Sequence, residues 1–151
     1  MRIVLLAGAV LAGMLLAACG DDDAADGGDG GGNEVGVTLQ EFNVIPDSDS
    51  AGAGDITFNV ENVGPDDVHE FVVIKTDLEA DALPTLDDGS VDEEGAGVEV
   101  IDEIEDIPVG ETQTLTVNLE AGAYVLICNI YDEDENEAHY QEGMHTAFTV
   151  E

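Results

Sequence analysis

The stretch Gly122–Val150 reads GAYVLICNIYDEDENEAHYQEGMHTAFTV, and each of its ends is an apolar segment with a period of two. Successive side chains of a β-strand point to opposite faces. Leu126 and Cys128 therefore share one face, and Met144 shares a face with Phe148. We expect two strands that bring a thiol and a thioether toward the core.

Similar alternation recurs upstream, bounded by Gly, Pro, Asn and Asp, and no segment has a clear helical period. The expected strands are Gly36–Val44, Ile56–Glu61, Val68–Lys75, Val98–Glu105, Thr112–Leu119, Ala123–Ile130 and His145–Val150. Seven short strands within about 117 residues predict an all-β, Greek-key β-sandwich. Residues 77–97 are acidic and interrupt the pattern, so they form either a surface excursion or a short helix near Leu78–Leu83.

The N-terminus resembles an export signal. Arg2 precedes the apolar run Ile3–Leu16, which is followed by small residues and Cys19. We interpret residues 1–18 as a signal peptide ending in a lipobox, with Cys19 as the lipidated first residue of the mature chain. An ordinary signal peptide or an uncleaved anchor is the alternative. Each interpretation predicts an extracytoplasmic protein, at the cell surface or in the periplasm.

Residues 19–34 are rich in Gly and Asp and contain almost no apolar side chain that could be buried. We expect a disordered, acidic tether between a membrane lipid anchor and a folded domain at residues 35–151. The domain is long enough for one core, and we expect a monomer.

The chain has 36 acidic residues against two basic ones, giving a formal net charge of −34. Nucleic acid and anionic lipid headgroups would be repelled, so neither is an expected partner. The acidic residues are spread along the whole domain. This distribution favours a general adaptation, such as life in salt, over one docking patch.

Four side chains could meet at one end of the sandwich. If Cys19 is lipidated, Cys128 has no cysteine partner, and it is either a small buried hydrophobe or a metal ligand. His69 shares a face with apolar residues of its strand, and the connection from Cys128 to Met144 contains His139. A thiolate, two imidazoles and a weak thioether form the donor set of blue copper, because Zn²⁺ prefers a tetrahedron without a thioether.

Four segments carry a family resemblance. They are Gly54–Gly64 (GDITFNVENVG), His69–Val73 (HEFVV), Gly122–Cys128 (GAYVLIC) and His139–Met144 (HYQEGM). Together they resemble the cupredoxins, particularly plastocyanin-like and azurin-like bacterial copper proteins, over nearly all of residues 35–151.

The resemblance implies one copper ion with His69, Cys128 and His139 as equatorial ligands and Met144 as the axial ligand. It also implies electron transfer through the edge of His139, near the surface. One departure is the connection 129–138, which is longer than the tight turn of plastocyanins. It could bulge outward and leave the ligands in place, or it could cover His139.

We therefore expect a type 1 copper protein that carries electrons between redox partners and is not an enzyme. The first alternative is a copper-handling lipoprotein that captures and delivers the metal. The second is a metal-free adhesive or structural sandwich.

Other metal sites and catalytic sets have weaker support. His145 as a further ligand would make a Cys-His₃ zinc set, but its strand parity points it away from the core. The acidic runs 92–94 and 132–137 lack the loop spacing of a calcium site. No nucleophile, base and orienting group occur in a recognisable pattern.

Overall fold

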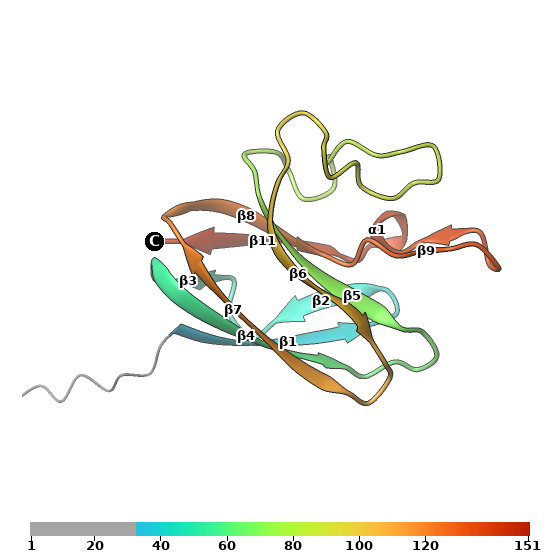
Figure 1. Cartoon of the computed structure of the whole chain (residues 1–151), viewed down its shortest axis with the longest axis horizontal. Coiled ribbons are helices and arrows are strands. Elements are labelled where there is room, and N and C mark those ends of the chain that lie inside the picture. Colours follow the sequence, from blue (N-terminus) through green and yellow to red (C-terminus); the bar gives the residue numbers. More distant parts are fainter. Residues whose placement is uncertain (1–32) are drawn as a thin grey trace, which may run out of the picture.

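Two β-sheets pack face to face in this chain (Figure 1). The computed structural model describes residues 33–151. The first sheet has the order β2-β1-β4-β7. Its strands are β1 (Asn33–Gln40), β2 (Asn43–Pro46), β4 (Gly54–Asn62) and β7 (Thr112–Leu119). β1 runs parallel to β4, and the other pairs are antiparallel.

The second sheet has the order β3-β11-β8-β5-β6. Its strands are β3 (Ser50–Ala51), β5 (His69–Lys75), β6 (Glu99–Ile107), β8 (Gly122–Ile127) and β11 (His145–Val150). The chain passes between the sheets after β2, β3, β4, β6 and β7, so neighbouring strands are often distant in sequence. The predicted all-β sandwich is confirmed.

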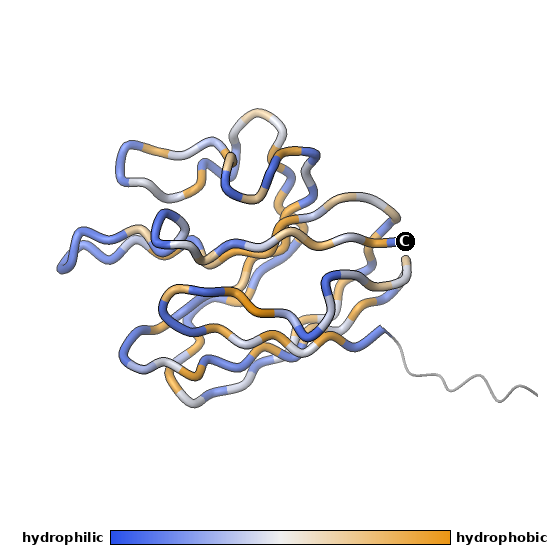
Figure 2. The backbone as a smooth tube through the Cα atoms, turned by 180° about the vertical axis from the view of Figure 1, so that it is seen from behind, coloured by the Kyte–Doolittle hydropathy of each residue, from blue (hydrophilic) through white to orange (hydrophobic). Residues whose placement is uncertain are grey.

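The core lies between the two sheets and follows from the alternation of side chains. Every second residue of β1 and β7 is buried, while the intervening residues face outward. The buried side chains of both sheets form one apolar cluster, in which the Phe58 ring centroid lies 5.3 Å from that of Phe71 and 5.6 Å from that of Phe148. Figure 2 shows the apolar segments gathered along the strands and the polar ones in the connections.

A second apolar cluster covers the outer face of the second sheet. β5 and β8 are buried on both faces because residues 76–98 lie over them. Leu83 and Val91 of this segment pack with Val72, Ile127 and Tyr140. The segment contains no helix, only turns and one isolated bridge between Thr85 and Val91, so residues 77–97 are the surface excursion and not the helix.

Two further elements lie between Cys128 and Met144, two of the expected ligands. They are the hairpin β9 (Tyr131–Asp132) and β10 (Glu137–Ala138) and the single-turn helix α1 (His139–Glu142). The hairpin projects from one end of the sandwich and is mostly hydrophilic (Figures 1 and 2).

Most expected strands are present with small shifts of their ends, and one expectation was wrong. The single strand expected at Gly36–Val44 is two strands, β1 and β2, which turn at Glu41 and Phe42 and pair with each other. β1 begins at Asn33, two residues before the domain start that the sequence suggested.

The signal peptide at 1–18, the lipid-modified Cys19 and nearly all of the tether at 19–34 lie outside the described residues. Among residues 33–151, no helix has the length and apolar character needed to cross a membrane.

Candidate metal centre

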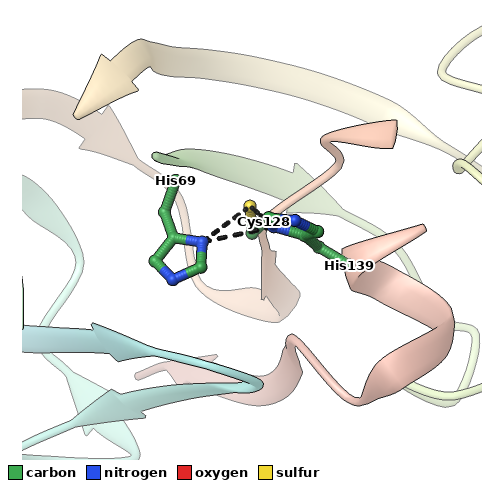
Figure 3. Close-up of side chains that lie close together, drawn as sticks. All are labelled: His69, Cys128 and His139. Atoms are coloured by element: carbon green, nitrogen blue, oxygen red, sulfur yellow. Dashed lines mark hydrogen bonds between the residues drawn. The ribbon is translucent and has the colours of Figure 1, made fainter. Parts of the chain in front are cut away.

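Three of the four expected ligands converge at one end of the sandwich (Figure 3). His69 is the first residue of β5, Cys128 directly follows β8, and His139 begins α1. The Nδ1 atoms of the two histidines lie 3.2 Å apart. Cys128 Sγ lies 3.4 Å from Nδ1 of His139 and 3.8 Å from Nδ1 of His69.

These distances suit a metal ion. Bonds of about 2.0 Å to nitrogen and about 2.3 Å to sulfur, at angles of roughly 110–120°, place such donors about 3.3–3.7 Å apart. The three side chains are also enclosed, with His69 and Cys128 at 0% exposure and His139 at 1%. One ion between them would satisfy three buried polar groups at once.

The sulfur of Cys128 is held by the backbone of β5. The amide of Glu70 donates a hydrogen bond to Sγ at 3.3 Å. Burial raises the pKa of the Cys128 thiol to about 12, although the amides of Glu70 and Ile130 lower it. The thiol therefore keeps its proton until a cation replaces it, as is usual for a thiolate ligand.

The two histidines are neutral ligand candidates. Burial lowers the pKa of His69, and the neighbouring His139 lowers it further. Burial also lowers the pKa of His139. A neutral imidazole offers a lone pair to a metal, so both rings are in the form that ligation requires.

Met144 lies beside Cys128 in the fold. Its carbonyl accepts a hydrogen bond from the Cys128 amide at 3.0 Å, and its own amide donates to the His139 carbonyl at 3.0 Å. Its side chain is fully buried in the cluster that contains Cys128 and Phe148. The strand parity expected for Met144 and Cys128 is confirmed, and both side chains lie in the same buried cluster.

The long connection leaves the three donors together, and one of them, His139, is covered by side chains from several segments. Its acidic residues project in the β9–β10 hairpin, and the amide of His139 donates to the Ile130 carbonyl at 2.9 Å, which closes the loop. The surface position implied for His139 was wrong, because the ring is buried. Phe42 packs edge-on against it with ring centroids 5.3 Å apart, and Asp67 and Glu137 bring carboxylate oxygens within 4.8 Å of a ring nitrogen.

Several residues that support the site were not predicted from the sequence. Glu70 accepts a hydrogen bond from the Asn129 amide at 2.8 Å, which ties the strand of His69 to the end of the strand of Cys128. Burial raises the pKa of Glu70 to about 7, although the Asn129 amide lowers it. The position of Glu70 within the mostly apolar segment HEFVVI could have indicated its role in the site. The sequence around Phe42 contains no comparable signal.

His145 does not join the three donors. Its strand parity turns it away from the core, as expected, and its ring packs on Tyr140 with centroids 5.0 Å apart. Among the described residues, the acidic run 92–94 supplies no carboxylate to a group with metal-binding spacing. The run 132–137 supplies one, Glu137, which lies close to Asp67 and His139.

Comparisons with known proteins bear on the fold. No protein-family model matches the chain, and no curated protein matches it in sequence. Solved structures do match. The reduced auracyanin of the photosynthetic bacterium Roseiflexus castenholzii has a TM-score of 0.54 at 20% identity, over 80% of this chain and 98% of that one.

Two further structures agree with this match. Auracyanin A, a "blue" copper protein from the green thermophilic photosynthetic bacterium Chloroflexus aurantiacus, has a TM-score of 0.53 at 17% identity, over 80% of this chain and 100% of that one. Reduced rusticyanin has a TM-score of 0.51 at 17% identity, over 78% of each chain. At these identities the similarity is one of fold. Together with the arrangement of His69, Cys128, His139 and Met144, it identifies the chain as a protein of the cupredoxin fold.

Proposed function

We propose that this protein is a type 1 copper protein that transfers electrons outside the cytoplasm. The observation that carries the proposal is the buried group of two imidazole nitrogens and one cysteine sulfur, 3.2 to 3.8 Å apart, with Met144 beside the cysteine. We propose His69, Cys128 and His139 as equatorial ligands and Met144 as the axial ligand.

Copper bound there would supply a one-electron couple between Cu(II) and Cu(I). The chain's own contribution is to fix the donors and exclude water. Cys128 and Met144 are joined by a backbone hydrogen bond, and Glu70 and Asn129 join the strands on the other side. Donors held in this way would move little between oxidation states, and their burial would keep a substrate away from the ion. Both features favour an electron carrier over an enzyme.

The location and partners are part of the same proposal. Lipid on Cys19 would hold the domain at the membrane surface, and the tether would let it reach redox proteins there. The charge of −34 favours partners with a cationic docking surface. We propose that the domain acts as a monomer and binds no nucleic acid.

Copper loading tests the proposal. The purified protein, stripped with a chelator and given one equivalent of Cu(II), should develop an intense sulfur-to-copper charge-transfer band in the visible spectrum. It should also show a reversible reduction potential. A protein that holds only Cu(I) and passes it to an acceptor chelator, with no stable oxidised form, would instead be the copper-handling protein.

Three variants complete the test. Cys128→Ser and His139→Ala should abolish the band, whereas His145→Ala should keep it. His145 is the matched control because it is a partly buried histidine six residues from His139 that lies outside the donor group. A colourless copper complex of the unaltered protein, or a band that needs His145, would refute the proposed site.

A further inference from the structure

Two buried polar groups lie next to each other on the side of the His69 ring that points away from Cys128. Within residues 33–151, the buried side-chain nitrogen and oxygen atoms without a hydrogen-bond partner are His69 Nε2 and Glu41 Oε2. An unpaired buried polar group destabilises the folded state. The other oxygen of the same carboxylate, Glu41 Oε1, lies 3.7 Å from His69 Nε2.

The carboxylate of Glu41 is held in place by the segment that leads into β5. Its Oε1 accepts hydrogen bonds from the amides of Asp66 at 3.1 Å and Asp67 at 2.7 Å. The Glu41 side chain is only 11% exposed, and that of His69 is fully buried. The turn between β1 and β2 thus presents an acid to one histidine of the site, and the next residue, Phe42, packs on the other histidine.

The ring of His69 has two distinct sides. Its Nδ1 faces Cys128 and His139, so Nδ1 is the atom available to a metal (Figure 3). When a histidine binds a metal through one nitrogen, the other nitrogen carries the proton and requires an acceptor. Glu41 is the acidic side chain that lies next to that nitrogen.

We propose that Glu41 is a positioning residue of the copper site, which accepts a hydrogen bond from His69 Nε2–H and sets the reduction potential through its buried negative charge. This inference rests on the proposed function. The present 3.7 Å separation is longer than a hydrogen bond, and a movement of less than about 1 Å would close it. The amides of Asp66 and Asp67 that donate to Glu41 Oε1 stabilise the carboxylate in its charged form.

The charge of Glu41 has a different effect from the many surface acids. Salt screens exposed charges within about 8 Å at physiological ionic strength, whereas a buried charge beside a ligand is screened much less. A fixed anion there favours the metal ion of higher charge. Glu41 therefore stabilises Cu(II) over Cu(I) and lowers the reduction potential.

The first test compares Glu41→Gln with Glu34→Gln. Both variants remove one negative charge from the same chain segment. Glu34 is exposed near the start of β1 and lies seven residues, or roughly 23 Å of extended strand, from Glu41. In 0.15 M salt, Glu41→Gln should lower the affinity for Cu(II) relative to Cu(I) about tenfold, which is a rise of about 59 mV in potential. Glu34→Gln should change this ratio less than about twofold.

The second test needs no copper. In the metal-free, unaltered chain, nitrogen-15 spectra should show the His69 proton on Nε2, and Glu41→Gln should speed its exchange with solvent. Equal shifts of potential in the two variants, or a His69 proton on Nδ1 in the unaltered chain, would overturn the role of Glu41. An unaltered chain that binds no copper but carries the proton on Nε2 would refute the proposed function and support the contact with Glu41.

Discussion

Met144 is the residue that we propose tunes the site without defining it. In the proposed site the thiolate and the two imidazoles would supply most of the binding, and the thioether would be a weak axial donor that adjusts the potential. The side chain of Met144 is fully buried, and its backbone is hydrogen-bonded to both Cys128 and His139. Its position is therefore fixed independently of any bond from its sulfur.

We predict that Met144→Leu keeps the blue band and raises the reduction potential. Leucine has nearly the same volume, so the loss of folding stability should stay below about 1.5 kcal/mol. Removing the sulfur removes a donor that favours Cu(II), and the ratio of Cu(II) to Cu(I) affinity should fall about tenfold, or about 59 mV. Voltammetry of the two proteins measures this shift. An unchanged potential would show that the thioether is only a core side chain.

At the scale of elements, residues 76–98 brace the chain on both sides of the connection 129–138, next to the proposed ligands Cys128 and His139. Tyr140, next to His139, donates its hydroxyl to the Ala80 carbonyl at 2.9 Å and accepts from the Leu83 amide at 3.0 Å. Asn129, next to Cys128, accepts a hydrogen bond from the Val91 amide and donates to the Val91 carbonyl. Both ends of the connection are therefore tied to the same excursion.

We predict that Tyr140→Phe lowers the free energy of unfolding of the metal-free protein by roughly 1–3 kcal/mol, because two backbone groups lose their partner. Urea unfolding measures the loss. The matched control is Tyr131→Phe, whose hydroxyl donates to Asn136 on the exposed hairpin at 3.3 Å. This variant should change stability by less than about 0.5 kcal/mol. Equal effects of the two variants would mean that the excursion does not brace the site.

The elements also show what sequence patterns can predict. β7 and β11 have the expected ends, because their alternation is regular and turn residues flank them. The same parity predicted the direction of Cys128. The turn at Glu41 and Phe42 was missed since it contains no Gly, Asn or Pro. Glu41 lies beside His69, and Phe42 lies beside His139. Segments distant in the sequence make these contacts, so no local sequence pattern predicts them.

At the scale of the whole molecule, the charge balance is extreme. Lys75 is the only Lys or Arg among residues 33–151, and it pairs with Glu120 at 3.2 Å on the surface. Burial and neighbouring acids raise the pKa of Glu103 and of Glu137. The fold therefore brings together carboxylates that repel one another, and the unfolded chain relieves this repulsion by expanding.

We predict that salt stabilises the metal-free protein by screening this repulsion. The Debye length falls from about 30 Å at 0.01 M to about 8 Å at 0.15 M and about 3 Å at 1 M. Most of the gain, on the order of 2 kcal/mol, should therefore appear below about 0.3 M. Unfolding by urea, which is uncharged, at a series of NaCl concentrations measures it, and KCl at equal ionic strength is the control.

The shape of the salt curve decides between two causes. Screening depends on ionic strength and saturates once the Debye length is shorter than the spacing of the surface acids. Exclusion of salt from the protein surface instead grows steadily through the molar range and differs between salts. A protein that gains stability only above about 1 M, and by different amounts in NaCl and KCl, would show that repulsion between its 36 acidic residues is not what limits its stability.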